Sequence, residues 1–115
     1  MNGKELQDGL EELIKEHGDF PLTDEWDSPI NAWAFLRAED SDEGEPCVYF
    51  YKTSEEILKA SQVLAVYRTT RDGSASNELD PWDEQWITND QEGDVAIEFS
   101  PVDGDEGARI MLVSS

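Results

Sequence analysis

The chain has 115 residues, of which 37% are hydrophobic and 10% aromatic, a composition that predicts a folded single domain over residues 1–115 and excludes a disordered acidic tail. Asp and Glu number 28 against 8 Lys and Arg, which gives a formal net charge of -20 at pH 7. Such a surface repels phosphates, so we expect no direct binding to nucleic acid and an attraction to basic proteins.

The first predicted element is an amphipathic helix from about Lys4 to His17. Its apolar residues recur at the spacing of one helical face, while acidic residues occupy the other faces. These apolar residues are Leu6, Leu10, Leu13 and Ile14. Gly18 supplies a helix stop, and we expect the apolar stripe to pack on a sheet. His17 is the only histidine, and its place near the helix end predicts a capping or dipole role.

Residues 20–29 contain Pro, Thr, Asp and Ser around one Trp, which predicts an ordered connection. The segment that follows has two interpretations. Ser28-Pro29 is a good helix start, whereas Trp33 and Phe35 alternate with smaller residues as they would in a strand. We favour a strand over residues 32–38 and expect an aromatic-rich strand over residues 47–52.

Cys47 is the only cysteine, so the chain cannot form an internal disulfide. It directly precedes the apolar run Val48-Tyr49-Phe50, a setting that predicts a small buried residue rather than a nucleophile. We therefore expect no Cys-His catalytic pair.

An acidic loop lies between these two predicted strands. Its carboxylates are Glu39, Asp40, Asp42, Glu43 and Glu45. Because so many like charges cannot be buried, we expect an exposed tip. Asp40 and Asp42 also resemble the first two ligands of an EF-hand loop, although the glycine is misplaced and no Glu occupies the last ligand position. A weak calcium-binding module therefore stays an alternative.

Thr53 and Glu56 have the spacing of a capping box, which predicts a short helix that continues through Ala60. Val63 to Thr69 has the composition of a strand, and residues 71–77 are rich in turn residues. A second acidic segment follows, formed by Asp80, Trp82, Asp83 and Glu84. Trp82 is either a core residue or an interface anchor surrounded by a charged rim.

Gln85 to Thr88 and Val95 to Phe99 both have strand character, and the turn residues of Asn89 to Gly93 would join them as an antiparallel hairpin at the centre of the sheet. A third acidic turn contains Asp103, Asp105 and Glu106, and a last strand runs from Ala108 to Val113. These elements predict an α+β fold, with a mostly antiparallel sheet of about five strands on which the N-terminal helix and one short helix pack.

Motifs for chemistry are missing. The sequence contains no Gly-rich phosphate loop, no metal-ligand cluster and no Ser-His-Asp set, so we expect neither catalytic residues, nor a cofactor, nor a bound metal. No apolar run approaches the roughly 20 residues of a membrane span. We expect a cytoplasmic protein without a membrane partner.

Two segments resemble a known family. Residues 84–99, EQWITNDQEGDVAIEF, combine an aromatic-initiated strand, an acidic turn with glycine and a Gly-Asp before an apolar strand, and residues 49–58 read YFYKTSEEIL. In this arrangement the chain resembles the SUKH superfamily of bacterial toxin-immunity proteins, whose second helix would have to correspond to residues 29–37. The first helix, the acidic turns and residues 94–99 also resemble small cyanobacterial nuclease inhibitors. Both resemblances imply a protein that blocks a toxin or nuclease by binding it.

The first functional hypothesis is therefore an acidic inhibitory protein, either an immunity protein or a nucleic-acid mimic, that binds a basic nuclease, toxin or nucleic-acid-binding protein. The three acidic segments would form one continuous negative face. The predicted partner-binding residues are Glu39, Asp40, Asp42, Glu43, Glu45, Asp80, Trp82, Asp83, Glu84, Asp103, Asp105 and Glu106. The alternative is a non-enzymatic domain whose acidity is an adaptation to high salt.

Overall fold

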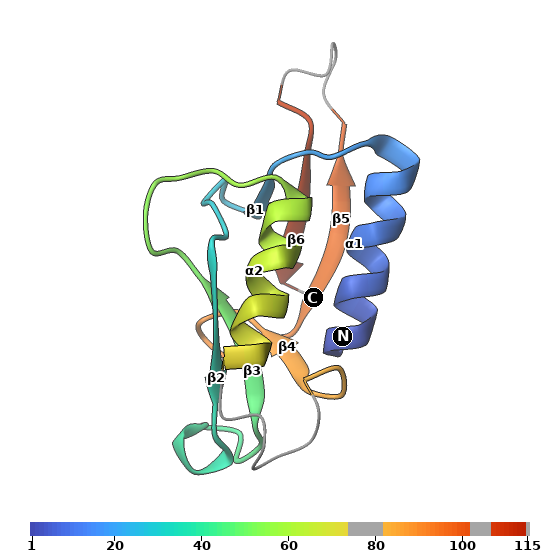
Figure 1. Ribbon diagram of the computed structural model, residues 1–115. Helices are drawn as coiled ribbons and strands as arrows, with labels where there is room; N and C mark the ends of the chain where they lie inside the picture. The colour runs from blue at the N-terminus through green and yellow to red at the C-terminus, as the bar shows by residue number, and fades with distance from the viewer. Residues whose placement is uncertain (74–81, 102–106, 115) are drawn as a thin grey trace.

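The computed structural model describes residues 1–73, 82–101 and 107–114. In these residues two helices accompany two three-stranded sheets, with strand orders β1-β6-β5 and β2-β3-β4 (Figure 1). The helices are α1 (Gly3–His17) and α2 (Ala60–Gly73), and a 3-10 turn, η1, spans Ala38–Asp40. The strands are β1 (Leu22–Asp24), β2 (Ala32–Leu36), β3 (Cys47–Tyr51), β4 (Trp86–Thr88), β5 (Val95–Ser100) and β6 (Arg109–Ser114). The α+β class is confirmed, but the single, mostly antiparallel sheet is replaced by two mixed sheets.

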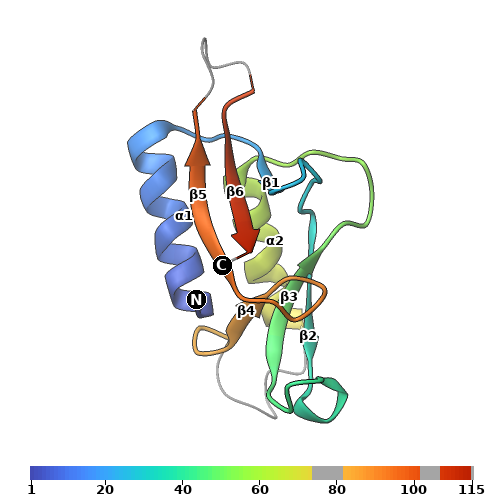
Figure 2. The same cartoon turned by 180° about the vertical axis from the view of Figure 1, so that it is seen from behind.

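Both helices lie on the same side of the strands, as the front and back views show (Figures 1 and 2). The hydrophobic core fills the space between these layers and includes residues of α1, α2 and both sheets. The strand faces turned away from the helices are not covered by any described helix (Figure 2).

Helix α1 confirms the prediction from the apolar spacing. Leu6 and Leu10 are fully buried, and Gly18 ends the helix with a φ of 110°, where a side chain would be strained. Asn2 and Glu5 form a capping box, in which the Asn2 side chain accepts a hydrogen bond from the Glu5 amide at 2.8 Å. His17 lies in the last turn and stacks on Phe99, with ring centroids 3.9 Å apart.

The strand interpretation of the ambiguous segment is confirmed. β2 pairs antiparallel with β3, which brings Trp33 opposite Phe50, and the alternative helix is wrong. The sequence interpretation was also wrong about residues 20–29, because Leu22 to Asp24 form β1, which pairs parallel with β6.

Two further predictions are wrong about the middle of the chain. Residues 52–58 are not helical, because Asn31 accepts hydrogen bonds from the backbone and hydroxyl of Thr53 instead. The predicted strand Val63 to Thr69 lies inside α2, where Val63, Leu64 and Tyr67 are buried on one helical face. Tertiary packing overrides the strand propensity of the β-branched residues here.

The predicted central hairpin is also wrong. Asn89 to Gly93 do form a turn, but β4 pairs parallel with β3 and β5 pairs antiparallel with β6, so the two strands belong to different sheets. A single bridge between Thr88 and Asp94 is the only ladder contact that joins them among the described residues.

Trp82 belongs to the core, with 2% of its surface exposed. Its ring packs against Tyr67 at 5.5 Å between centroids, and the Tyr67 hydroxyl donates a hydrogen bond to the Trp82 carbonyl at 3.2 Å. Phe35 covers the ring at a centroid distance of 6.3 Å. The core interpretation of Trp82 is therefore correct, and the side chain is not available as an interface anchor in this conformation.

We predict that Trp82→Ala lowers the free energy of unfolding by about 3–5 kcal/mol, because it removes a large buried ring and leaves a cavity. The matched control is Trp26→Ala, since Trp26 is 74% exposed and its loss should change stability by no more than about 0.5 kcal/mol. Urea denaturation of both variants measures the difference. Equal effects of the two substitutions would show that Trp82 does not support the core.

Candidate functional site

The outward face of the β2-β3-β4 sheet carries aromatic side chains. Since successive residues of a strand point to opposite faces, Val48, Phe50 and Ile87 face the core, where they are buried. Their neighbours point away from the helices. The outward residues of β3 and β4 are Cys47, Tyr49, Tyr51, Trp86 and Thr88. Trp86 and Tyr51 are exposed, and the other three lie beneath two loops.

The two loops are the acidic loop of residues 41–46 and the turn of residues 89–94. Asn89 holds the turn together, because its side-chain oxygen accepts hydrogen bonds from the amides of Gln91 at 2.9 Å and Gly93 at 2.8 Å. Glu92 then joins the loops, since its two carboxylate oxygens lie 3.2 and 3.0 Å from the Asp42 amide nitrogen, which donates to them. Glu92 has a φ of 63°, which costs a non-glycine residue conformational energy.

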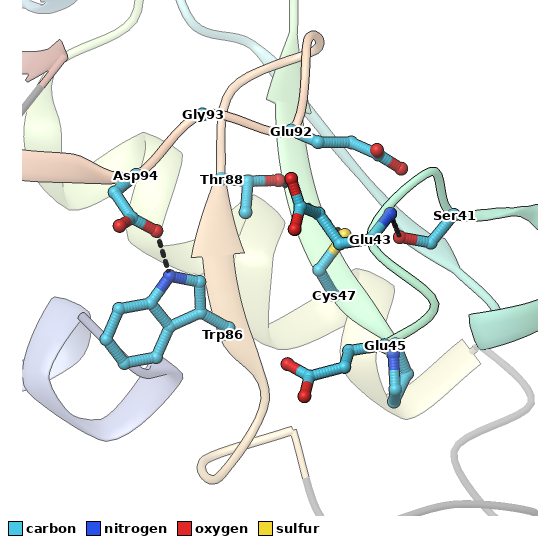
Figure 3. A pocket seen from close by; sticks show the side chains of 10 residues that line it. Ser41, Glu43, Glu45, Cys47, Trp86, Thr88, Glu92, Gly93 and Asp94 are labelled. Atoms are coloured by element: carbon cyan, nitrogen blue, oxygen red, sulfur yellow. Dashed lines mark hydrogen bonds between the residues drawn. The ribbon is translucent and has the colours of Figure 1, made fainter.

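Between these loops and the sheet lies a cleft of about 570 Å³ (Figure 3). We call it the acidic cleft. It is lined by Ser41, Glu43, Glu45, Pro46, Cys47, Trp86, Thr88, Glu92, Gly93 and Asp94. Four of these ten residues are carboxylates. A second hollow of about 440 Å³ shares Glu92 with the cleft and is lined by Leu36, Asp42, Tyr49, Asn89, Asp90 and Gln91 as well.

Trp86 forms one wall of the acidic cleft and is 45% exposed. Its indole N–H donates a hydrogen bond to Oδ1 of Asp94, with 2.5 Å between the heavy atoms, so the ring is held in place. The Glu45 carboxylate extends from the opposite side of the cleft towards Trp86 (Figure 3). The site therefore combines a fixed, exposed aromatic ring with carboxylates around it.

The carboxylates of the cleft have no cationic partner among the described residues. Neither hollow is lined by a Lys, Arg or His within the part of the chain that the structure describes. Several basic residues pair with carboxylates outside the cleft. These pairs are Lys52–Glu55, Arg68–Glu11, Arg71–Asp83, Arg109–Asp27 and Arg37–Glu39. The cleft thus presents uncompensated negative charge to solvent, which favours a cationic ligand.

The structure brings three of the predicted binding residues to these hollows: Asp42, Glu43 and Glu45. Glu39 and Asp40 belong to η1 beside them, and Glu84 is exposed in the turn before β4. Asp83 has a structural role, because it accepts hydrogen bonds from Arg71 at 3.0 Å and Gln7 at 2.7 Å.

The remaining predicted residues, Asp80, Asp103, Asp105 and Glu106, lie outside the described residues. The end of β5 and the start of β6, between which the third acidic turn falls in the sequence, lie at the opposite end of the molecule from η1 (Figure 1). The continuous face that would unite all three acidic segments stays a prediction.

Sequence reasoning missed Trp86, Glu92 and Asp94. The sequence contained two signals. The turn of residues 89–94 is itself acidic, and the alternation along β4 places Trp86 on the face of the strand opposite to that of the buried Ile87. Because we expected that turn to join a hairpin at the centre of the sheet, its proximity to the first acidic loop was not predicted.

In residues 1–73, 82–101 and 107–114, no group of three or more His, Cys, Asp or Glu side chains is arranged to hold a metal ion. Likewise, neither described helix is long and apolar enough to span a membrane. No protein-family model matches the chain, and searches of curated proteins and of solved structures found no significant match.

Cys47 lies at the bottom of the acidic cleft, and only 5% of its surface is exposed, as the sequence predicted. Burial raises the pKa of its thiol, the Thr88 hydroxyl at 3.7 Å opposes that effect, and the nearby Glu92 charge raises the pKa further. Because the thiol stays protonated at neutral pH, it is a poor nucleophile.

We predict that iodoacetamide alkylates Cys47 much more slowly in the native protein at pH 7 than in urea, where the thiol is exposed and its pKa returns to the ordinary value. Mass spectrometry of timed samples measures both rates. Since the raised pKa disfavours the thiolate, alkylation of the native protein should accelerate as the pH rises. A native rate equal to that in urea would contradict the burial of this thiol.

Proposed function

We propose that the chain is an acidic, non-enzymatic binding protein that neutralises a basic nuclease, toxin or other nucleic-acid-binding protein. One observation carries this proposal: a concave, uncompensated acidic cleft with an exposed tryptophan lies on a sheet face that no described helix covers. Tryptophan is enriched among the residues that dominate protein interfaces, and charge around it sets the choice of partner.

The net charge supports the same class of partner. A formal charge of -20 on 115 residues attracts basic proteins and repels nucleic acid, so a protein with a phosphate-binding groove is a complementary ligand. The resemblances to SUKH immunity proteins and to nuclease inhibitors imply inhibition by binding without a cofactor, although residues 32–36 form strand β2 where the second SUKH helix would have to lie.

The cleft offers two kinds of contribution to such a complex. Exposed acids on the loops would accelerate the encounter with the partner but add little to the affinity, because ion pairs at the solvated rim of an interface are screened over a Debye length of about 8 Å in physiological salt. Residence time would depend on an apolar anchor that becomes buried. Trp86 has the exposure for that role, which Trp82 lacks.

The binding partner for this test is the basic protein that the wild-type chain captures from its host. We predict that the triple variant Asp42→Asn, Glu43→Gln, Glu45→Gln associates with this partner about tenfold more slowly at low salt, and that its association rate depends less steeply on salt concentration. Surface plasmon resonance at several salt concentrations measures both quantities. The substitutions leave the Asp42 amide free to donate to Glu92, so the loop contact is retained.

The matched control is Asp8→Asn, Glu12→Gln, Glu16→Gln, which removes three charges from exposed positions of α1. This helix packs on the core side of the strands, whereas the cleft is lined by outward-facing residues of β3 and β4 and by the two loops. If the control slows association as much as the cleft variant does, total charge rather than the cleft governs binding, and the proposed site is wrong.

The salt-adaptation alternative makes a different prediction about folding. Because 18 hydrophobic residues are buried in the described part of the chain, we expect the chain to unfold cooperatively in urea at low salt, with only a modest stabilisation when salt screens its self-repulsion. Urea curves at low and molar salt measure this. A chain that folds only in molar salt would instead support adaptation to high salt.

A further inference from the structure

We infer that the acidic cleft receives an arginine side chain of the basic partner, with the guanidinium against the Trp86 ring. This inference rests on the proposed function and adds which chemical group is recognised and by which residues. It follows from the exposed ring, the position of Asp94 and the carboxylate on the opposite wall.

Asp94 determines which part of Trp86 a ligand meets. The indole N–H is already engaged by Oδ1 of Asp94, so the exposed 45% of the residue offers the ring's carbon surface rather than a free donor. The face of an indole attracts cations through its quadrupole, and it does so more strongly than Tyr or Phe. The ring is therefore a surface for a cation, already oriented before the ligand arrives.

The carboxylates then select for a planar cation with donors at its edge. Glu45 extends towards Trp86 from the other wall, and Asp94 lies beside the ring (Figure 3). A guanidinium can stack on an aromatic face while its N–H groups form paired hydrogen bonds with carboxylates in its own plane. A lysine ammonium is compact and strongly hydrated, so it gains less from such a cleft.

The bottom of the cleft fits this assignment because it is neutral. Cys47 and Thr88 line it, and the Thr88 hydroxyl already donates to the cysteine sulfur. A volume of about 570 Å³ accommodates a side chain of this size together with water. Hence an arginine stem would lie over the floor while its charge remains between the two walls.

Hexa-arginine, hexa-lysine and hexa-citrulline peptides test the inference with the full chain. Citrulline keeps the planar shape of arginine without its charge, so it separates charge from shape. We expect hexa-arginine to bind about fivefold or more tightly than hexa-lysine at equal salt, by calorimetry, and to shift the indole N–H resonance of Trp86. Hexa-citrulline should not bind measurably.

Trp86→Leu should abolish the preference for arginine while leaving the affinity for hexa-lysine within about twofold, because it removes the π face but no charge. Trp26→Leu, at a 74% exposed tryptophan that does not line the cleft, should keep the preference. Asp94→Asn keeps an oxygen that can accept from the indole while it removes the charge, so it should weaken both cationic peptides.

The outcomes separate the inference from the proposed function. Equal affinities for the arginine and lysine peptides, or a preference that survives Trp86→Leu, would overturn the arginine site and leave the binding of a basic partner intact. Failure of the wild-type chain to bind either cationic peptide would overturn both. The Trp86 indole shift is measured on the wild-type chain, so a folding defect of a variant cannot obscure the result.

Discussion

The fold depends on how residues 82–87 are held between the two helices. Tyr67 of α2 donates to the Trp82 carbonyl at 3.2 Å, and the amides of Gly3 and Lys4 donate to the carbonyls of Gln85 and Asp83, each at 3.0 Å. Gly3 permits this approach, because a Cβ there would lie 2.2 Å from the Tyr67 hydroxyl and 2.3 Å from the Trp82 carbonyl oxygen. The Ile87 amide then donates to the Met1 carbonyl at 2.9 Å, so the N-terminal residue covers the edge of β4.

This arrangement determines which tryptophan is buried and which is exposed. With Trp82 fixed in the core, the chain enters β4 in the parallel register that places Trp86 opposite Cys47 and Ile87 opposite Val48. Ile87 therefore faces the core and Trp86 faces outward. The turn after β4 brings Glu92 to the Asp42 amide, so two acidic segments that are far apart in the sequence form one cleft.

Elements governed by local periodicity could be predicted from the sequence, whereas those governed by distant partners could not. The apolar stripe of α1 and the alternation of β2, β3 and β6 led to the correct element types. The β-branched residues of α2 suggested a strand, because its buried face is defined only by packing against β2 and α1. Of the site, the acidic loop was predicted, but Trp86 and Asp94 required the parallel pairing of β3 with β4, which depends on the N-terminal contacts.

The proposed binding of a basic ligand to the outward face of the β2-β3-β4 sheet can be followed residue by residue. Amide chemical-shift mapping of the isotope-labelled chain, titrated with hexa-arginine peptide at physiological salt, tests it most directly. We expect the largest shifts in residues 41–47 and 86–94, which contain the residues that line the acidic cleft. Shifts spread evenly over all acidic segments, or concentrated on α1 and α2, would contradict it, because they would reveal attraction to the net charge without a site.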